Sequence, residues 1–334
     1  MVNMINIVTS LPGRKISEEK KKKVTDVSPQ VNLQDASSWV SEEMAGNLHH
    51  QKELNNMLGN TEILLACELP NNLIKRAPRI KWIQTTHVGV EKFLKDKDLI
   101  ESPLTLTNAS GIQAEAISEY VILLMLAFDK HLMVFAELKK QKNWKRITMV
   151  GLASQTIGIL GLGNIGKAVA KRARALGMHV IAYDRPRKLM RAQNVDKLVS
   201  GDDIKQIFKE SDFVVSCLPL SPKTIGIIGE KELRMMQPTA HLINISRGKV
   251  VKEDVLIRAL KEKWIAGAGL DVFMTEPLPA DSPLWDLPNV IYSPHCCGRL
   301  DDKDDRVMDL FTTNLKRYVN GRRLLNRVDK KAGF

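Results

Sequence analysis

The sequence has few cysteines and no long apolar run. Its four cysteines among 334 residues show neither metal-ligand spacing nor a disulfide framework, so we expect a reducing cytoplasm and no metal site. The longest central apolar run, residues 120–128, is far too short to cross a bilayer, and the first residues lack the pattern of a secretory signal. We therefore expect no membrane partner. With 44% hydrophobic and 26% charged residues, the chain fits a globular protein of about two domains.

Acidic residues are fewer than basic ones, 38 against 50, which leaves a net charge of +12. Such a surplus attracts nucleic acid, but it also attracts anionic cofactors and carboxylate substrates. The densest basic run, residues 20–23, follows Ser17 and two glutamates, a pattern that favours a capped, solvated helix over a nucleic-acid patch. Because no zinc-finger spacing or RNA-binding aromatic motif is present, we expect no nucleic-acid partner.

A glycine-rich turn is the most informative motif. Gly161, Gly163 and Gly166 have G-x-G-x-x-G spacing, with Asn164 and Ile165 between them, after an apolar run and before a helical pattern. In this setting the first glycine allows a tight turn, the second lets the backbone approach a pyrophosphate, and the third lets helix and strand pack closely. The amino end of the helix faces the phosphate charge. A dinucleotide site is favoured over an unrelated glycine turn.

An acid, Asp184, comes eighteen residues after the last glycine of this turn, at the end of the next apolar run. Its carboxylate can accept hydrogen bonds from the adenosine ribose and repel a 2′-phosphate, which favours NAD. Arg185, Arg187 and Lys188 follow at once. They form either a solvated loop or a site for that phosphate, so NADP is the less favoured alternative.

Strand and helix patterns alternate along the chain, which predicts an α/β fold with parallel sheets covered on both faces. The expected strands are residues 5–8, 63–66, 81–84, 156–160, 180–183, 213–216, 242–245, 268–272 and 290–293. Expected helices include residues 18–24, 253–262 and 306–319, the last ending at Asn320 and Gly321. A proline-free periodic stretch from 112 to about 138 predicts one long helix.

Polar groups gather at three expected strand ends, in residues 244–248, 270–279 and 293–298. In a doubly wound sheet the carboxyl ends of the strands meet at the ligand crevice. Arg247, Glu276 and His295 can therefore converge near the nicotinamide end of a cofactor. Each alone is more often a turn arginine, a loop glutamate or a strand-end histidine. Their joint order after a dinucleotide turn predicts an active site.

On these residues the sequence resembles the D-isomer-specific 2-hydroxyacid dehydrogenases, strongly after the glycine turn and weakly before residue 60. The resemblance implies a Rossmann-type doubly wound parallel sheet at residues 111–299 that binds NAD. It also implies a smaller, flavodoxin-like α/β substrate lobe made of residues 1–110 and 300–334. Further cofactor contacts are implied, besides the glycine turn and Asp184, at Leu218, Pro219, Thr224, Ile245, Asp271 and His295.

The residue types suit the reaction that this resemblance implies, the reversible reduction of small 2-oxo acids to D-2-hydroxy acids. Arg247 has a cationic fork that can grip the carboxylate and polarise the carbonyl. His295 can give the proton that the new alkoxide needs, and Glu276 would favour the imidazolium and fix the ring. The backbone amides of Val88 and Gly89 would hold the carboxylate from the other lobe.

The substrate and the class of function stay open at this stage. Glyoxylate, hydroxypyruvate and bulkier 2-oxo acids are all candidates, as is a phosphoglycerate substrate, whereas the presence of Glu276 argues against a formate dehydrogenase. An NAD-sensing transcriptional corepressor of the same fold is the alternative from another class. The apolar residues 120–128 predict a homodimer contact, with core packing as the alternative.

Two features near the expected site need their own interpretation. Cys296 and Cys297 follow His295; we interpret them as small packing residues, and a redox-sensitive thiolate is the alternative. The acidic residues Asp301, Asp302, Asp304 and Asp305 predict a solvated helix start and imply no metal.

Overall fold

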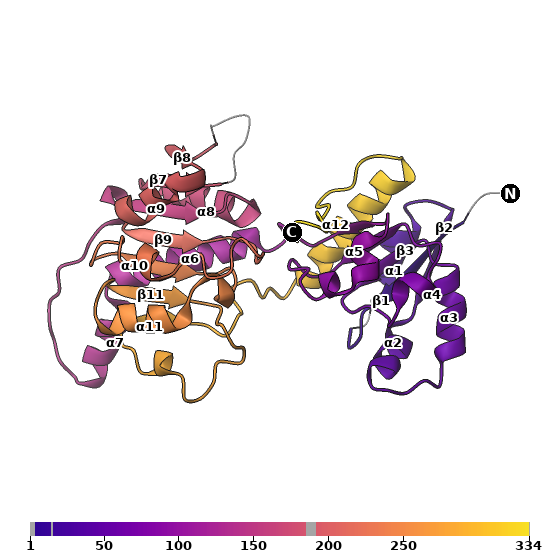
Figure 1. Ribbon diagram of the computed structural model, residues 1–334, viewed down its shortest axis with the longest axis horizontal. Helices are drawn as coiled ribbons and strands as arrows, with labels where there is room; N and C mark the ends of the chain where they lie inside the picture. The colour runs from indigo at the N-terminus through magenta and orange to yellow at the C-terminus, as the bar shows by residue number, and fades with distance from the viewer. Residues whose placement is uncertain (1–3, 15, 185–191, 334) are drawn as a thin grey trace. The chain divides into compact units, whose positions relative to one another are not determined.

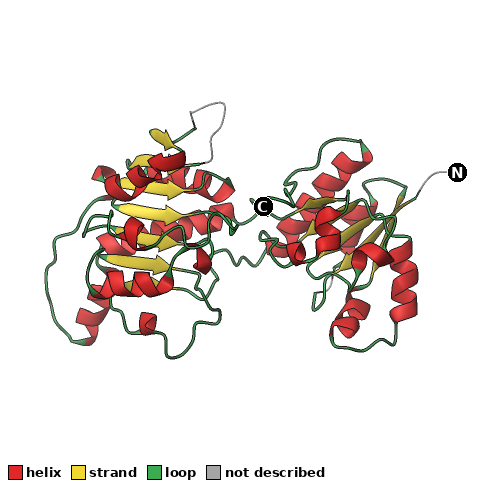
Figure 2. Cartoon of the chain, in the orientation of Figure 1, coloured by secondary structure: helices red, strands yellow, loops and turns green. Residues whose placement is uncertain are grey.

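The computed structural model describes residues 4–14, 16–184 and 192–333, and the chain divides into two compact units (Figure 1). Unit 1 comprises Met1–Ile112 and Asp301–Phe334, and unit 2 comprises Gln113–Leu300. Both units place helices against a parallel sheet (Figure 2), which confirms the predicted α/β class.

Within the described residues, unit 1 contains one five-stranded parallel sheet with the order β2-β1-β3-β4-β5, the flavodoxin-like order that was expected. Its strands are β1 (Ile5–Ser10), β2 (Val31–Asp35), β3 (Ile63–Ala66), β4 (Trp82–Thr85) and β5 (Thr105–Thr107). Its helices are α1 (Glu18–Thr25), α2 (Ser37–Met44), α3 (Gln51–Gly59), α4 (Leu73–Arg76), α5 (Lys97–Glu101) and α12 (Lys303–Val319). Buried residues of α1 and α12 form one core cluster, and those of α2 to α5 contribute to another.

The carboxyl-terminal helix α12 belongs to unit 1 because its apolar face completes the core there. Phe311 is fully buried, with its ring 5.3 Å from that of Trp82 on β4. Asn314, also buried, donates a hydrogen bond to Gln84 on the same strand at 3.2 Å. Burying this face gives the helix its stability and makes the unit discontinuous in sequence.

The two charged runs singled out from the sequence are helix starts. Ser17 caps α1 by accepting a hydrogen bond from the Lys20 amide at 3.3 Å, as the capped-helix prediction requires. Asp304 and Asp305 lie in the first turn of α12, which confirms the helix start predicted there. The two runs also pair with each other, through Lys20 and Asp305 at 2.8 Å. Within the described residues, no group of three or more His, Cys, Asp or Glu side chains is placed to hold a metal ion.

Unit 2 contains, in its described part, a seven-stranded parallel sheet with the order β12-β11-β10-β9-β6-β7-β8. The strand order reverses between β6 and β9, as in a Rossmann-type doubly wound sheet. The strands are β6 (Thr156–Leu160), β7 (His179–Tyr183), β8 (Lys197–Val199), β9 (Phe213–Ser216), β10 (His241–Asn244), β11 (Gly267–Leu270) and β12 (Val290–Tyr292).

Helices cover both faces of this sheet. The covering helices are α6 (Ala114–Asp129), α8 (Asn164–Ala175), α9 (Ile204–Glu210), α10 (Glu230–Leu233) and α11 (Glu253–Lys261), whereas α7 (Leu132–Lys140) has no buried residue. Buried residues of α6 and α8 share one core cluster with the sheet, while those of α9, α10 and α11 belong to a second cluster. The strands are therefore buried on both sides, which explains their nearly continuous apolar sequences.

The prediction of a single helix from 112 to about 138 is wrong. Helix α6 ends at Asp129, and α7 begins at Leu132 after His131, whose φ of 53° is left-handed and cannot continue a right-handed helix. Asp129 is buried at the break, and the Lys130 ammonium donates to the carbonyl of Val150. Apolar residues recur at helical spacing on both sides of the polar residues 129–131, so the periodicity did not reveal the break.

Residues 120–128, predicted as a dimer contact, lie in α6 and contribute largely to the core of their own unit. Val121, Leu124 and Met125 are buried there, whereas Leu123 is 52% exposed. Most of this stretch therefore follows the core-packing alternative. No helix among the described residues is long and apolar enough to span a bilayer.

Candidate active site

The glycine turn joins β6 to α8. Gly161 has a φ of 95°, which a residue with a Cβ rarely adopts, and a Cβ on Gly166 would lie 2.1 Å from the Gly161 carbonyl oxygen. No described atom lies within 4 Å of a Cβ built on Gly163, so the backbone there is open in front of the first turn of α8, which contains Asn164 and Ile165. The open backbone of the turn and the positive end of the α8 dipole both suit the binding of a dinucleotide pyrophosphate.

Asp184 follows β7, the strand next to β6, and its amide donates to the Val199 carbonyl of β8 at 3.1 Å. The acid thus stands at the carboxyl end of the strand that follows the glycine turn, where dinucleotide-binding folds hold the ribose. Arg185, Arg187 and Lys188 lie outside the described residues.

Leu218, Pro219 and Thr224 follow β9, whose carboxyl end neighbours the glycine turn. The Cys217 amide donates to the Leu160 carbonyl at 2.8 Å, and the buried Leu218 side chain comes within 3.3 Å of a Cβ built on Gly161. The Thr224 hydroxyl donates to the Pro219 carbonyl at 2.6 Å, which fixes the shape of the loop. These residues fit one wall of a cofactor site.

Arg247 is carried by a short turn after β10. The buried Asn244 holds this turn, because its Oδ1 accepts from the Ser246 hydroxyl at 2.8 Å and its Nδ2 donates to the Arg247 carbonyl at 3.1 Å. Ile245 is buried beneath the turn. The Arg247 guanidinium donates to the Ser246 carbonyl at 2.8 Å and is partly exposed.

Gly248 brings the Arg247 turn against the loop that carries Glu276. A Cβ on Gly248 would lie 1.9 Å from the carbonyl carbon of Phe273 and 2.5 Å from the amide nitrogen of Met274, so another residue cannot be accommodated without moving one of the two loops. Gly248 was not singled out from the sequence for this role.

Asp271, after β11, organises the loop that carries His295. Its buried Oδ1 accepts from the Ser293 hydroxyl at 2.5 Å and from the amides of Cys296 and Cys297 at 2.9 and 3.0 Å. Its backbone carbonyl accepts from the His295 amide at 2.8 Å. His295 is held with a φ of 51°, a conformation that is uncommon outside glycine and that clusters at functional sites.

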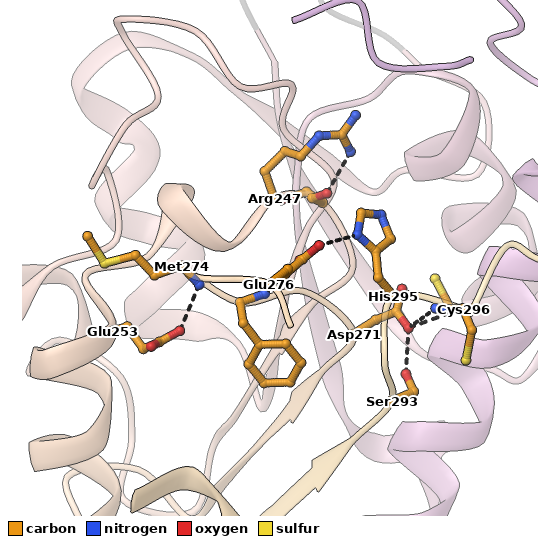
Figure 3. Close-up of polar contacts among 11 residues, drawn as sticks. Arg247, Glu253, Asp271, Met274, Glu276, Ser293, His295 and Cys296 are labelled. Atoms are coloured by element: carbon orange, nitrogen blue, oxygen red, sulfur yellow. Dashed lines mark hydrogen bonds and ion pairs between the residues drawn. The ribbon is translucent and has the colours of Figure 1, made fainter. Parts of the chain in front are cut away.

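Glu276 and His295 form a direct pair (Figure 3). His295 Nδ1 lies 2.7 Å from Glu276 Oε2, while Oε1 of the same carboxylate accepts from the Phe273 amide at 3.0 Å. The carboxylate is thus anchored at one oxygen and orients the imidazole with the other. Because Nδ1 is paired with Glu276, Nε2 is the ring nitrogen that can contact a substrate. Figure 3 shows Arg247, Glu276 and His295 on loops that follow β10, β11 and β12.

Cys297, the second cysteine after His295, packs against the core of unit 2, as the packing interpretation expects. Burial and the neighbouring Asp271 carboxyl raise the pKa of the Cys297 thiol well above its ordinary range, so the thiol stays protonated at neutral pH. Because a thiolate is the reactive form, this environment argues against the redox-sensitive alternative at Cys297.

Val88 and Gly89 lie in unit 1, after β4, whereas Arg247, Glu276 and His295 lie in unit 2. The loop of Val88 is held by the Asn108 side chain, which donates to the Val88 carbonyl at 2.8 Å. His87, just before it, was not singled out from the sequence. Burial, together with the nearby cations of Lys303 and Arg14, lowers its pKa, so it is neutral at pH 7.

Comparisons with known proteins agree with this geometry. Residues 122–297 match the family model described as "D-isomer specific 2-hydroxyacid dehydrogenase, NAD binding domain". A glyoxylate reductase from Korarchaeum cryptofilum is 33% identical over 276 residues, covering 80% of this chain and 82% of the relative. One from Thermococcus litoralis is 34% identical over the same length, with the same coverage. A D-isomer specific 2-hydroxyacid dehydrogenase from Xanthobacter autotrophicus Py2, solved with NADPH and MES, is 25% identical with a TM-score of 0.83 and full coverage of both chains.

Proposed function

The chain belongs to the D-isomer-specific 2-hydroxyacid dehydrogenase family, and we propose that it reduces small 2-oxo acids to D-2-hydroxy acids in a reversible reaction. The observation that carries this proposal is the anchored Glu276–His295 pair, which shares the carboxyl edge of one sheet with Arg247 and the glycine turn. The relatives are named as reductases and dehydrogenases, and nothing in these findings favours the corepressor alternative.

We assign the chemical steps to side chains of this chain. A nicotinamide dinucleotide, held by the glycine turn and Asp184, supplies the hydride. Arg247 binds the substrate carboxylate and draws electron density toward the carbonyl oxygen. His295 then gives a proton from Nε2 to that oxygen, and takes it back in the oxidation direction. Glu276 positions the ring and compensates its positive charge.

The remaining assignments extend the proposal to unit 1 and to the cofactor. We infer that Met1–Ile112 with Asp301–Phe334 binds the substrate, with the amides of Val88 and Gly89 as carboxylate donors, and that Gln113–Leu300 binds the cofactor. Leu218, Pro219, Thr224, Ile245 and Asp271 would contact the cofactor. Asp184 favours NAD because a carboxylate repels a 2′-phosphate, although the Xanthobacter relative was solved with NADPH.

We also propose that the protein works in the cytoplasm as a homodimer. The support for a dimer lies on α6 and α7 and in the segment after them, where large apolar side chains face solvent: Leu123 is 52%, Leu132 53% and Trp144 92% exposed. Large apolar side chains that face solvent are common at protein interfaces. The mass of the assembly in solution, by light scattering, tests this assignment.

The test of the reaction is NADH oxidation with glyoxylate, hydroxypyruvate and a bulkier 2-oxo acid such as 2-oxoisocaproate. We expect turnover that depends on the 2-oxo acid, a product of D configuration wherever the product is chiral, and glyoxylate among the accepted substrates, as for the relatives named glyoxylate reductase. Absence of turnover with the whole panel, with NADH bound, contradicts the proposal. Equal or better kcat/KM with NADPH contradicts the NAD assignment alone.

A further inference from the structure

A cavity of about 350 Å³ lies in unit 2 at the amino ends of the strands, the opposite edge of the sheet from the glycine turn. Residues just before or at the start of β6, β9, β10, β11 and β12 line one side of it, and the junction of α6 and α7 lines the other. Its size is that of sites for small ligands. None of the residues assigned to the proposed reaction is among those that line it.

The cavity contains hydrogen-bond acceptors that lack donors. Asp129, at the end of α6, is 6% exposed, and its Oδ1 accepts from the Gln155 side-chain amide at 3.4 Å. Within the described part of the chain, neither Asp129 Oδ2 nor Gln155 Oε1 has a hydrogen-bond partner. Because buried polar atoms are nearly always satisfied, two unmatched acceptors in one cavity indicate an occupant that donates hydrogen bonds.

In the described part of the chain, the nearby basic groups donate no hydrogen bond to Asp129 Oδ2 or Gln155 Oε1. Lys130 donates to the Val150 carbonyl, and His131 Nε2 lies 3.2 Å from the carbonyl of Thr148. His241 stacks between Phe128 and Phe213, at 4.3 and 5.3 Å between ring centres, and burial lowers its pKa to about 4, so it is uncharged at neutral pH. The lining therefore combines two acids, Asp129 and Asp212, with aromatic walls, a setting suited to a cation.

We propose that this cavity binds a cationic nitrogen group, an amidinium, guanidinium or primary ammonium, which donates hydrogen bonds to Asp129 and Gln155 while its carbon body packs on Phe128 and Val134. An amidinium matches a carboxylate with two parallel hydrogen bonds, the strongest arrangement available to a buried acid. An anionic or purely acceptor ligand would add repulsion to acceptors that are already unmatched.

The cation can come from a free small molecule or from a second copy of this chain. The last turn of α7 and the segment after it carry exposed basic residues and Trp144; these residues are Lys139, Lys140, Lys142, Lys145 and Arg146. The chemistry at Asp129 is the same for both sources, so the experiment separates them by the state of assembly.

The probe is benzamidine, with benzamide as its uncharged counterpart, titrated into the full-length protein by calorimetry. We expect one benzamidine per chain, at least tenfold weaker binding of benzamide, and at least tenfold weaker benzamidine binding to Asp129→Asn. Asp254→Asn removes an exposed acid on α11 outside the cavity and is the matched charge control, for which binding stays unchanged. NADH binding to Asp129→Asn, followed by fluorescence, shows that the fold is retained.

Sedimentation of the same samples identifies the source of the cation. If a second copy fills the cavity, Asp129→Asn and saturating benzamidine each shift the assembly toward monomers, and Arg146→Gln or a Lys→Gln change in the same segment does likewise. If a free molecule fills it, benzamidine binds as described and the assembly is unchanged. The proposal is overturned when Asp129→Asn alters neither benzamidine binding nor the assembly, or when benzamidine competes with NADH instead.

Discussion

The two edges of the sheet in unit 2 differ in how many hydrogen bonds hold their acidic side chains. At the carboxyl edge Asp271 Oδ1 accepts from Ser293, Cys296 and Cys297, and Glu276 bridges an amide and His295, although Asp271 Oδ2 has no partner among the described residues. At the amino edge Asp129 keeps an acceptor without a donor in the described residues. The donors at the carboxyl edge hold the Asp271 and Glu276 carboxylates in place before substrate arrives, and preorganised groups of this kind stabilise a transition state. The unmatched acceptor of Asp129 at the amino edge instead marks a place where a ligand would complete the hydrogen bonds.

The largest expected effect tests whether the carboxyl edge performs the chemistry. His295→Gln removes the proton donor but keeps a polar side chain, so kcat for 2-oxo acid reduction should fall by about 10³-fold or more. NADH binding, followed by fluorescence, should stay normal and serves as the control for folding. A His295→Gln enzyme with near-normal kcat would mean that another group delivers the proton.

Arg247→Ala should lower kcat/KM for every accepted 2-oxo acid by about 10²- to 10³-fold, because a charged contact at the reacting centre is lost. Arg247→Lys keeps the charge without the planar fork and is the matched variant, expected to recover only part of the loss. Steady-state kinetics with glyoxylate measures both. Full recovery by lysine would show that charge alone matters, and unchanged kinetics in the alanine variant would remove Arg247 from the mechanism.

Glu276→Gln tests whether the network at this edge acts by positioning His295. The amide can still accept from the Phe273 amide but carries no charge to balance the imidazolium, so kcat should fall by about tenfold, with the KM for NADH unchanged. In a His295→Gln background the same substitution should have little further effect, because the two residues act as a unit. If the losses in kcat multiply in the double variant, Glu276 acts independently of His295.

The carboxyl edge was predictable from sequence, and the reason is topological. Parallel strands bring their carboxyl ends together, so Arg247, Glu276 and His295 could be grouped without coordinates once the glycine turn identified the sheet. The contacts that hold them were not predictable. The closeness of Gly248 to Phe273 and the donors that converge on Asp271 depend on how three loops pack, and no periodicity in the sequence reports that packing.

The amino edge left no comparable signal. Asp129 and Gln155 are 26 residues apart and belong to no motif, and the polar residues 129–131 at the helix break are flanked on both sides by apolar residues at helical spacing. Strands β2, β5 and β8 were also missed, and β5 and β8 have only three residues each, which are too few to show alternation. Sequence patterns thus predicted the site at the carboxyl edge, which follows from the strand topology. They missed the cavity at the amino edge, which depends on how side chains pack.

The smallest expected effect concerns the stability of the amino edge. Burial lowers the pKa of His241 to about 4, below its ordinary value of 6.5, so the unfolded chain takes up a proton at a higher pH than the folded chain does. The stability associated with neutral His241 is therefore present above pH 6.5 and is lost as the pH falls toward 4. His241→Phe keeps an aromatic ring between Phe128 and Phe213 and removes the titrating nitrogen. Between pH 7.5 and pH 5 it should lose less stability than the wild type, by about 1 kcal/mol after allowance for partial exposure.

Thermal unfolding at the two pH values measures this difference, which corresponds to a shift in Tm of about 2 °C for a domain of this size. Asp129, whose pKa burial raises, contributes in the opposite direction, with stability lost as the pH rises, but it is present in both proteins and cancels in the comparison. His49→Gln, a change at an exposed histidine of unit 1, controls for the loss of a histidine as such. Equal losses in wild type and His241→Phe would show that protons reach His241 in the folded state, and the amino edge would then be more open to water than its stacked rings indicate.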